Sequence, residues 1–327
     1  MSSQPLILAT RGSALALAQA NTVLAECRRV VTDRSFDIRI FRTTGDKLQT
    51  ASVAAVDLPK GLFTKELEVA LLGREADLAV HSLKDLPTDL PDGLTLGAVG
   101  ERADARDVLV YRAAGRTTHR GFEDGLTLSV LPDGVTLATS STRRAAQARE
   151  LKPGVSVIPI RGNVGTRLRK VAEDGSMDAT LLAAAGLHRL GFRISEEGRM
   201  SGGPPGSDSS TLEVLRAAYL STEEMIPCVG QAAIGIETRA NDDSMRAICA
   251  ALNHSPTEDC VLAERAFLNA LGGGCQAAVA AFAEIVGDTL VLRAVSYLGG
   301  NPRRGEQRGP RSQAIELGVQ LAAFLTA

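Results

Sequence analysis

Several arginines of this chain stand where a predicted strand gives way to a helix or a turn. In open α/β sheets ligands bind at that edge, and helix N-termini there add unpaired amide donors. A guanidinium group binds two oxygens of a carboxylate or phosphate at once, so a crevice with several of them suits a multiply anionic ligand. The alternative is a set of solvated surface arginines. The segments ATR, ATSSTRR, PIRGNVGTR and AGLHRLG supply the candidates Arg11, Arg143, Arg144, Arg161, Arg167 and Arg189.

A carboxylate, Asp85, follows the predicted strand DLAV in the segment HSLKD, next to Lys84. In a site lined by arginines, this carboxylate can act as a general acid or base, or stabilise a positive charge that develops during a reaction. An ion pair or a helix cap before LPTDLP is the structural alternative. His81 is a second candidate for proton transfer, but a lone histidine at a strand end is more often a hydrogen-bonding spacer. We therefore rank Asp85 first.

A cysteine, Cys275, follows three glycines in the stretch LGGGCQAAVAAF, Leu271 to Phe282. Glycines leave the backbone almost free of side chains, so a bulky group can approach the sulfur closely. The stretch therefore has the features of an attachment point for a ligand. A buried, inert thiol is the commoner use of cysteine in intracellular proteins, and on this stretch alone it is the interpretation that ranks first.

The composition narrows the class of protein. A net charge of −2, three tyrosines and no tryptophan argue against a nucleic-acid surface, because few side chains can stack on bases. The five cysteines are scattered, without a CxxC pair or a histidine at ligand spacing, so we expect neither a disulfide framework nor a metal site. No run of about 18 apolar residues is present, and the N-terminus shows no targeting pattern. We expect a cytoplasmic protein without membrane association.

The elements that position these residues alternate between strands and helices over the first two-thirds of the chain. This alternation predicts βαβ units and a mostly parallel sheet in each of two lobes. The stretch Pro227 to Glu237 is typical of a strand that passes back to the first lobe. From about Asn253 a helix, two strands and a closing helix predict an α+β unit, with GGNPRRGEQRGPR as a polar loop. We assign no structure to the Gly- and Ser-rich run from Glu196 to Ser210.

From about Leu6 to the final helix, the chain resembles the porphobilinogen deaminases, also called hydroxymethylbilane synthases. The set TSSTRR, RGNVGTR and GGCQ is highly specific for this family, and added segments lie near 112–124 and 198–210. The full series of matching motifs, in chain order, is ATRGSALALAQA, TTGD, KGLFTKELEVALL, ADLAVHSLKDLP, TSSTRR, IRGNVGTRL, LAAAGLHRLG, VGQAAIGIE, LNH, AERAFL and GGGCQ.

The resemblance implies an α/β fold of three domains. Two are lobes with mixed sheets, similar to periplasmic binding proteins of the second type, and the third is a smaller α+β domain at the C-terminus. Domain 1 would comprise residues 1–102 and 231–250, domain 2 residues 103–230 and domain 3 residues 251–327. The third domain would carry Cys275 on a loop that points into the cleft between the lobes.

The resemblance also implies a transferase of tetrapyrrole (heme and porphyrin) biosynthesis. Such an enzyme condenses four porphobilinogen molecules head to tail onto a dipyrromethane cofactor that a thioether attaches to Cys275. Ammonia leaves at each step, and hydrolysis releases hydroxymethylbilane. Each pyrrole carries an acetate and a propionate, which the predicted arginine crevice would bind. The family further implies a monomer whose product passes to uroporphyrinogen-III synthase.

Matching motifs carry the family's site residues onto this chain. Asp85 would accept hydrogen bonds from pyrrole N–H groups and stabilise the azafulvene-like cation left when ammonia departs. The cofactor would be held by Lys84, Thr139, Ser140, Ser141, Arg143, Arg144, Arg161, Gly162 and Arg167. The substrate would be held by Arg11, Ser13, Lys60, Phe63, Arg161, Arg167 and Arg189, with Lys60 on a lid-like loop.

The chain departs from the family pattern in the lid and at three other places. Val56 and Leu58-Pro59 replace a lysine and a glycine pair, which removes one cation and predicts a stiffer hinge because proline fixes φ. Ala232 replaces the last glycine of GQG, Gly272 replaces a glutamate, and Ala277-Ala278 stands where a proline is usual. No catalytic residue is lost.

Three rival functions remain open. The first is a two-lobed anion-binding protein or inactive paralogue, which would carry no covalent adduct. The second is a transferase in which Cys275 is the nucleophile and a histidine is the base, although no histidine lies near it in sequence. The third is an RNA-binding protein, which the scarcity of aromatic residues disfavours.

Overall fold

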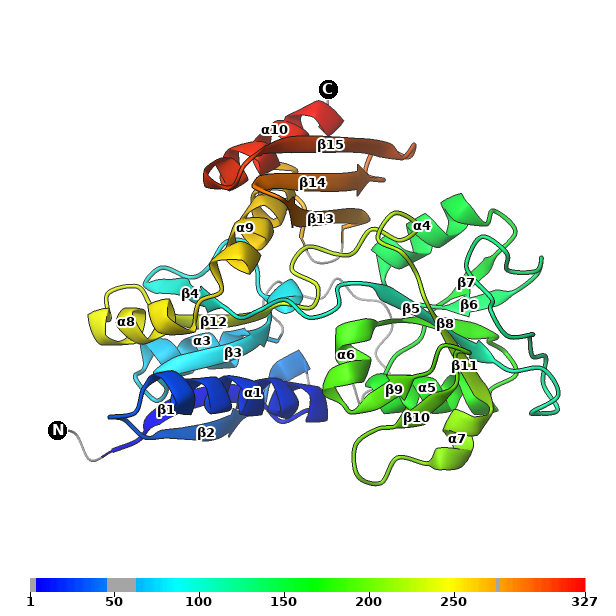
Figure 1. The fold of residues 1–327 in the computed structure, drawn as a ribbon, viewed down its shortest axis with the longest axis horizontal. Helices are drawn as coiled ribbons and strands as arrows, with labels where there is room; N and C mark the ends of the chain where they lie inside the picture. The colour runs from blue at the N-terminus through cyan, green and yellow to red at the C-terminus, as the bar shows by residue number, and fades with distance from the viewer. Residues whose placement is uncertain (1–3, 46–62, 275–276, 327) are drawn as a thin grey trace.

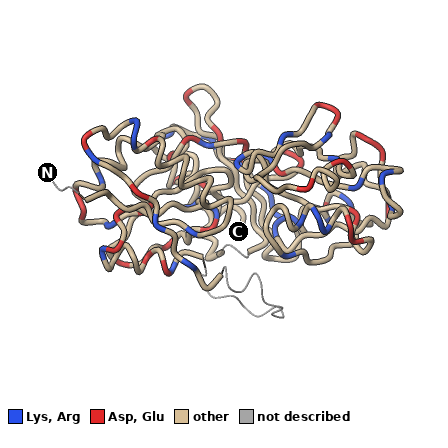
Figure 2. The backbone as a smooth tube through the Cα atoms, turned by 90° about the horizontal axis from the view of Figure 1, so that it is seen from below, with Lys and Arg blue, Asp and Glu red and all other residues tan. Residues whose placement is uncertain are grey.

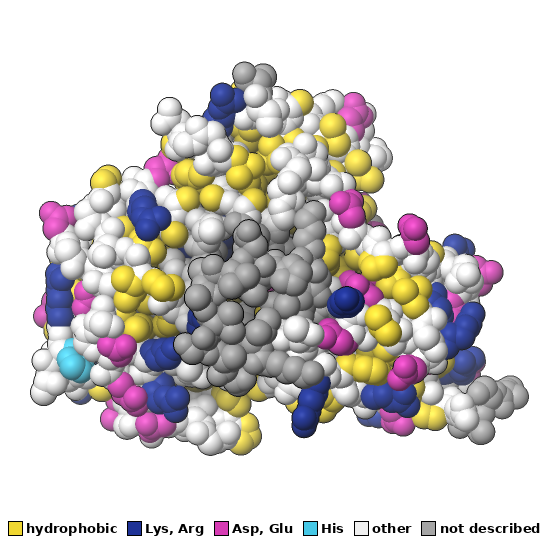
Figure 3. All heavy atoms as spheres, turned by 180° about the vertical axis from the view of Figure 1, so that it is seen from behind, with side chains coloured by type: hydrophobic (Ala, Val, Ile, Leu, Met, Phe, Trp, Pro, Cys, Tyr) yellow, Lys and Arg dark blue, Asp and Glu magenta, His cyan; other side chains and the backbone are white. Residues whose placement is uncertain are grey.

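The computed structural model describes residues 4–45, 63–274 and 277–326. Two α/β lobes lie side by side, and a smaller unit built from the C-terminal part of the chain lies across them (Figure 1). Basic and acidic residues are interspersed along both lobes (Figure 2). They are mixed on the face opposite that of Figure 1 as well (Figure 3). The distribution of charge over the surface therefore does not locate a site. The positions of individual side chains have to be used instead.

The first lobe is a five-stranded sheet in the order β2-β1-β3-β12-β4. Its first strand runs directly into α1, because the Ser13 side chain caps the helix by accepting a hydrogen bond from the Ala16 amide. Leu8, Leu78 and Ile236 form part of its core. The strands are β1 (Leu6–Arg11), β2 (Phe36–Phe41), β3 (Leu78–Ser82), β4 (Leu94–Val99) and β12 (Ile234–Arg239); the helices are α1 (Ala14–Val30), α3 (Lys65–Leu72) and α8 (Asp243–Leu252).

The second lobe is also a five-stranded sheet, in the order β11-β5-β8-β6-β7. Ser141 caps α4 and Asn163 caps α5, so two helices begin at the carboxyl ends of their strands as the sequence predicts. The strands are β5 (Asp107–Arg112), β6 (Thr136–Ala138), β7 (Ser156–Ile158), β8 (Ala179–Ala183) and β11 (Leu215–Tyr219); the helices are α4 (Thr142–Leu151), α5 (Val164–Glu173) and α6 (Ala184–Arg189).

Both sheets are mixed, so the mixed sheets implied by the family resemblance are confirmed, and the mostly parallel sheets predicted from the alternation of strands and helices are wrong. Strand β12 lies antiparallel between β3 and β4, and β5 lies antiparallel between β8 and β11. The chain enters the second lobe at β5 and returns to the first at β12, so these strands arrive by a crossing segment rather than through a βαβ unit. The predicted return of Pro227 to Glu237 to the first lobe is confirmed by the position of β12.

The run from Glu196 to Ser210, to which we assigned no structure, is folded in part. Strand β10 (Met200–Gly202) pairs with β9 (Phe192–Ile194), and α7 (Ser209–Glu213) follows. Met200 and Leu212 are buried in the core of the second lobe. Met200 within this stretch and Leu212 just after it pack into the core, although the composition of the stretch is typical of a linker.

The C-terminal unit is a three-stranded antiparallel sheet covered by two helices. Its elements are α9 (Ser255–Ala270), β13 (Val279–Val286), β14 (Thr289–Ser296), β15 (Arg303–Pro310), the 3-10 turn η2 (Arg311–Gln313) and α10 (Ala314–Thr326). The predicted polar loop is wrong, since it contains the edge strand β15, which pairs with β14 over its whole length. Gly305 and Gly309 take the inward positions, and a Cβ at Gly305 would lie 2.8 Å from Leu321 of α10. Because glycine and Gln307 take the inward positions, the strand has no apolar alternation that a sequence could show.

The strands of each sheet fall within one of the predicted domain ranges, while the exact boundaries stay a prediction. The boundary between residues 250 and 251 falls inside the last turn of α8. Within the described ranges, no helix is both long and apolar enough to cross a bilayer.

A buried carboxylate joins all three units. Glu264 of α9 accepts hydrogen bonds from Arg102, at 2.6 and 3.2 Å, and from the amides of Gly230 and Ala283, each at 2.8 Å. Arg102 and Gly230 belong to the two segments that cross between the lobes, and Ala283 belongs to β13. The third unit is therefore fastened to the crossing segments themselves.

A second buried carboxylate, Asp107, holds the start of the second lobe. It lies 2.7 Å from Arg143 and 2.6 Å from Arg144, and Gln231 of the returning segment donates to it at 3.3 Å. Burial opposes its ionisation, but the two guanidinium charges outweigh burial and hold the pKa of Asp107 far below its usual range.

Replacing Asp107 by asparagine should destabilise the protein by about 3–5 kcal/mol, because two buried guanidinium groups would lose their counter-charge. Chemical denaturation measures this loss. Asp133→Asn is the matched control: Asp133 pairs with Lys152 at 2.7 Å, but its side chain is 88% exposed. That variant should leave stability nearly unchanged, because solvent screens an exposed ion pair. Equal losses of stability in the two variants would contradict the stabilising role of the ion pairs of Asp107 with Arg143 and Arg144.

The returning segment contains a strained residue at Ala232, whose φ is +70°. This left-handed conformation costs a residue with a Cβ about 1–2 kcal/mol relative to glycine. The departure from the GQG pattern therefore falls at a position that favours glycine.

We expect Ala232→Gly to raise the free energy of unfolding by about 0.5–1 kcal/mol, because glycine adopts positive φ without strain. The neighbouring Ala233 is buried and does not have positive φ. Ala233→Gly should lower stability instead. Denaturation midpoints of both variants check this. A loss of stability in Ala232→Gly would show that the left-handed backbone at Ala232 is not strained.

Candidate active site

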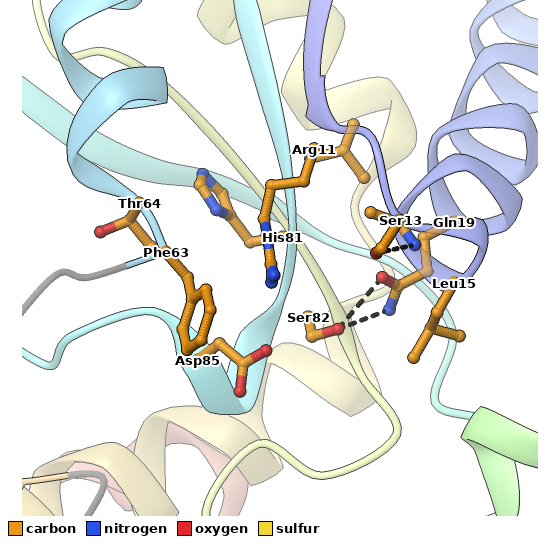
Figure 4. A pocket seen from close by; sticks show the side chains of 11 residues that line it. Arg11, Ser13, Leu15, Gln19, Phe63, Thr64, His81, Ser82 and Asp85 are labelled. Carbon is orange, nitrogen blue, oxygen red and sulfur yellow. Dashed lines mark hydrogen bonds between the residues drawn. The ribbon is translucent and has the colours of Figure 1, made fainter. Parts of the chain in front are cut away.

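A small pocket of about 60 Å³ opens at the carboxyl ends of β1 and β3 in the first lobe. Figure 4 shows side chains from β1, α1 and β3, and from the residues just before α3, arranged around it. Four predicted site residues from three segments, Arg11, Ser13, Phe63 and Asp85, meet here together with residues that the motifs did not single out. Its lining consists of Arg11, Ser13, Leu15, Ala16, Gln19, Phe63, Thr64, Val80, His81, Ser82 and Asp85.

Asp85 reaches the pocket because the chain turns sharply after β3. The 3-10 turn η1 (Leu83–Asp85) buries Leu83 and leaves Asp85 half-buried at the pocket wall. Arg265 of α9 donates to the carbonyls of Leu86 and Pro87, which fixes the chain just beyond the turn. Among the described residues, the Asp85 carboxylate has no hydrogen-bond or ion-pair partner, so its oxygens are available to a ligand.

Arg11 and Phe63 form a stacked pair in the same pocket. The Arg11 guanidinium lies 4.2 Å from the centre of the Phe63 ring, a cation–π contact that holds the charge toward the pocket. Ser13 lines the pocket and caps α1.

The pocket also contains Gln19 and Ser82, which the sequence analysis did not select. Their side chains hydrogen-bond to each other at 2.9–3.0 Å. Gln19 lies on the buried face of α1 together with Val23 and Cys27, and a polar residue at a position of this apolar stripe is the signal that would have found it.

The second lobe presents its own candidates where β6 and β7 end. The Ser140 hydroxyl donates to the Ile160 carbonyl at 2.8 Å and accepts from its amide at 3.1 Å, which joins TSSTRR to RGNVGTR. The Thr139 hydroxyl accepts from the amide of Ser141, which caps α4. These three residues are thus ordered at one sheet edge.

Position 162 requires glycine because of its backbone conformation and the lack of space for a side chain. Its φ is +119°, and a Cβ there would lie 2.6 Å from Thr166. The turn lets Arg167 of α5 donate to the Gly162 carbonyl at 2.8 Å, while the side chain of the adjacent Arg161 stays exposed.

Two arginines of the second lobe are desolvated without a counter-charge. Burial lowers the pKa of Arg167 to about 10, with repulsion from Arg144 as a second cause, and burial lowers the pKa of Arg189 to about 10. Within the described ranges no carboxylate pairs with either. Arg189 donates to the Ala232 carbonyl and Arg167 to that of Gly162. A ligand with several carboxylates would supply the missing charges, so these residues fit an anionic pyrrole cofactor.

Arg143 and Arg144 are placed differently from the other predicted arginines. Both are buried, and their ion pairs with Asp107 are joined by bonds to the carbonyls of Ile226 and Leu181. The structure thus gives them a partner inside the protein, and contact with the cofactor stays a prediction. Lys84 is half-buried beside Asp85. Cys275 and Lys60 lie outside the described residues.

Comparison with known proteins decides the family. Residues 6–247 match the profile described as "Porphobilinogen deaminase, dipyromethane cofactor binding domain", and residues 259–327 match "Porphobilinogen deaminase, C-terminal domain". The chain belongs to the porphobilinogen deaminase family. A porphobilinogen deaminase of Syntrophobacter fumaroxidans is 40% identical over 320 residues, which are 97% of this chain and 93% of that protein.

Membership of this family establishes the reaction and the cofactor of the protein. The protein is a hydroxymethylbilane synthase, a transferase of porphyrin biosynthesis that uses a dipyrromethane cofactor and takes porphobilinogen as substrate. Two solved structures are similar at low identity. One is a probable amino-acid ABC transporter extracellular-binding protein from Bacillus subtilis, at 11% identity, 77% of this chain, 91% of that chain and a TM-score of 0.41. The other is an ancestral amino acid-binding protein, at 11% identity, with 76% of this chain and 88% of that chain covered and a TM-score of 0.35.

Replacing Arg167 by glutamine should lower turnover by at least about 100-fold, because a desolvated cation facing carboxylates is removed. Stability should stay the same or rise slightly, since no buried counter-charge is orphaned. Steady-state kinetics and thermal unfolding measure the two effects.

Arg169→Gln is the matched control, since Arg169 lies exposed on the same helix. The turnover of Arg169→Gln should stay within about twofold of the wild type, and its thermal stability should be nearly unchanged. Normal turnover of Arg167→Gln would refute the binding of carboxylates by Arg167.

Proposed function

We propose that Asp85 is the catalytic residue of the hydroxymethylbilane synthase reaction. Its carboxylate lies at the wall of a pocket that also contains Arg11, and no described residue pairs with it. An unpaired anion beside a cation-lined site is suited to accept hydrogen bonds from pyrrole N–H groups. The same charge stabilises positive charge that develops as ammonia leaves porphobilinogen. This unpartnered carboxylate is the observation that carries the proposal.

The arginines are proposed to bind and orient the acidic side chains of cofactor and substrate. The bound dipyrromethane supplies the pyrrole to which each new unit is joined. Arg167 and Arg189 have desolvated guanidinium groups with free donors, which supports this role. Arg161 is exposed and can reach a larger guest as it grows. The full set of proposed cofactor and substrate contacts is Arg11, Ser13, Lys60, Phe63, Lys84, Thr139, Ser140, Ser141, Arg143, Arg144, Arg161, Gly162, Arg167 and Arg189.

Cys275 is proposed as the thioether anchor of the cofactor, on the strength of the GGGCQ motif and the cofactor-binding profile of the family. We propose in addition that the protein acts as a cytoplasmic monomer, contacts no nucleic acid, and hands its product to uroporphyrinogen-III synthase. The family resemblance supports these points.

Asp85→Asn tests the catalytic role, because it keeps the shape of the side chain and removes its charge. We expect turnover to fall by about 100- to 1,000-fold, as for loss of one electrostatic stabiliser. The intact mass of the variant should still exceed the sequence mass by a dipyrromethane, since attachment uses Cys275. Mass spectrometry and the rate of hydroxymethylbilane formation provide the two measurements.

Asp92→Asn is the control, because Asp92 is an exposed carboxylate a few residues further along. It should keep both turnover and adduct. If Asp85→Asn turns over as fast as the wild type, the proposed role of Asp85 is overturned. If the intact mass of the wild-type protein shows no adduct, the rival function of an inactive anion-binding protein is favoured.

A further inference from the structure

Three titratable side chains are buried beneath the Asp85 pocket. Glu68 of α3 is 8% exposed, His81 of β3 is 5% exposed and Glu237 of β12 is fully buried. None of them has a role in the contacts proposed for cofactor and substrate. Buried acids are rare unless they are paired, so this group needs an explanation.

The sheet register brings them together. His81 is opposite Gly235 in the antiparallel pair of β3 and β12, and Glu237 lies two residues further along the same face. The imidazole reaches along this face to Glu237, and His81 Nε2 lies 3.0 Å from Glu237 Oε2. Helix α3 packs on both strands and brings Glu68 to the pair.

The charges of this group are not balanced by other side chains. Within the described ranges, neither Glu68 nor Glu237 pairs with a lysine or arginine, and one carboxylate oxygen of each, Oε1, has no hydrogen-bond partner. The charged groups that act on Glu68 are Glu237, His81 and Glu66. Burial raises the pKa of Glu68 above its usual value. Two buried carboxylates and one imidazole become neutral as a group only when they share two protons.

The group reaches the pocket through His81, which lines it together with Arg11, Thr64 and Asp85 (Figure 4). We propose that Glu68, His81 and Glu237 form a buried proton store beneath the pocket, with His81 as the side chain that exchanges protons with it. This inference rests on the proposed function of Asp85 in the same pocket.

The reaction needs such a store. Each condensation forms one C–C bond, breaks a C–N bond whose electron pair leaves with ammonia, and frees one proton from a ring carbon. If Asp85 kept that proton, it would lose the negative charge with which it stabilises the developing cation. A neighbouring acceptor takes the proton and returns it to water, and Asp85 stays ionised.

Infrared spectroscopy of the full-length protein as purified tests the store directly. A protonated carboxyl absorbs separately from a carboxylate, and we expect such a band near neutral pH in the wild type and in Glu75→Gln. It should be missing in Glu68→Gln. Glu75 is the matched control because it is an exposed acid just beyond the same helix. Glu68→Gln resembles the protonated acid in shape, so the fold should be retained. A wild type without the band, or a Glu68→Gln variant that keeps it, would overturn the proposal.

Kinetics provide the second readout. In Glu68→Gln and His81→Gln, kcat should fall at least about tenfold with KM within about twofold, and the pH profile of kcat should shift. A purely structural group would leave that profile in place, so an unchanged profile in Glu68→Gln would refute the store even if His81→Gln fails to fold. The outcome is separable from the role of Asp85, because Asp85→Asn leaves the infrared band of Glu68 intact.

Discussion

The carboxylate of Glu264 is the point at which the three parts of this protein meet. It accepts hydrogen bonds from Arg102 and Gly230 of the two crossing segments and from Ala283 of the C-terminal unit. A buried anion with several donors around it is stable only when all of them are in place, so the arrangement of the lobes depends on it. On the same helix, Arg265 holds the chain just after Asp85. The C-terminal unit thus also fixes the chain next to Asp85.

The arginines of this protein separate into two groups by their partners. Arg143 and Arg144 face Asp107, and their charges are compensated inside the fold. Among the described residues, no carboxylate compensates Arg167 or Arg189, and burial lowers the pKa of each to about 10. An acidic ligand would supply the missing charge, so its binding would stabilise the site. The partner of an arginine is therefore a better guide to a proposed binding role than its place in a motif.

A site that holds both a polyanionic guest and a developing cation has to keep opposite charges apart. The structure does this by depth. The guanidinium groups line the sheet edges, Asp85 stands at the pocket wall, and the acids Glu68 and Glu237 lie beneath it in the core with His81. Within the described ranges, no lysine or arginine pairs with the deeper acids, which is why we propose protons as their counter-charge. Asp85 is more exposed than either of them.

The sequence by itself determined the family, the strand-to-helix turns and the residues at those turns, because caps, glycines and arginines act locally and leave a pattern. Ser13, Ser141 and Asn163 start their helices as their types predict. Only the tertiary structure decided which charges are compensated and which strands run antiparallel, since these depend on segments far apart in the chain. The pairing of His81 with Glu237 joins residues 156 positions apart. Strand β15 needed its partner β14 and the facing helix α10, because its inward glycines show no apolar pattern.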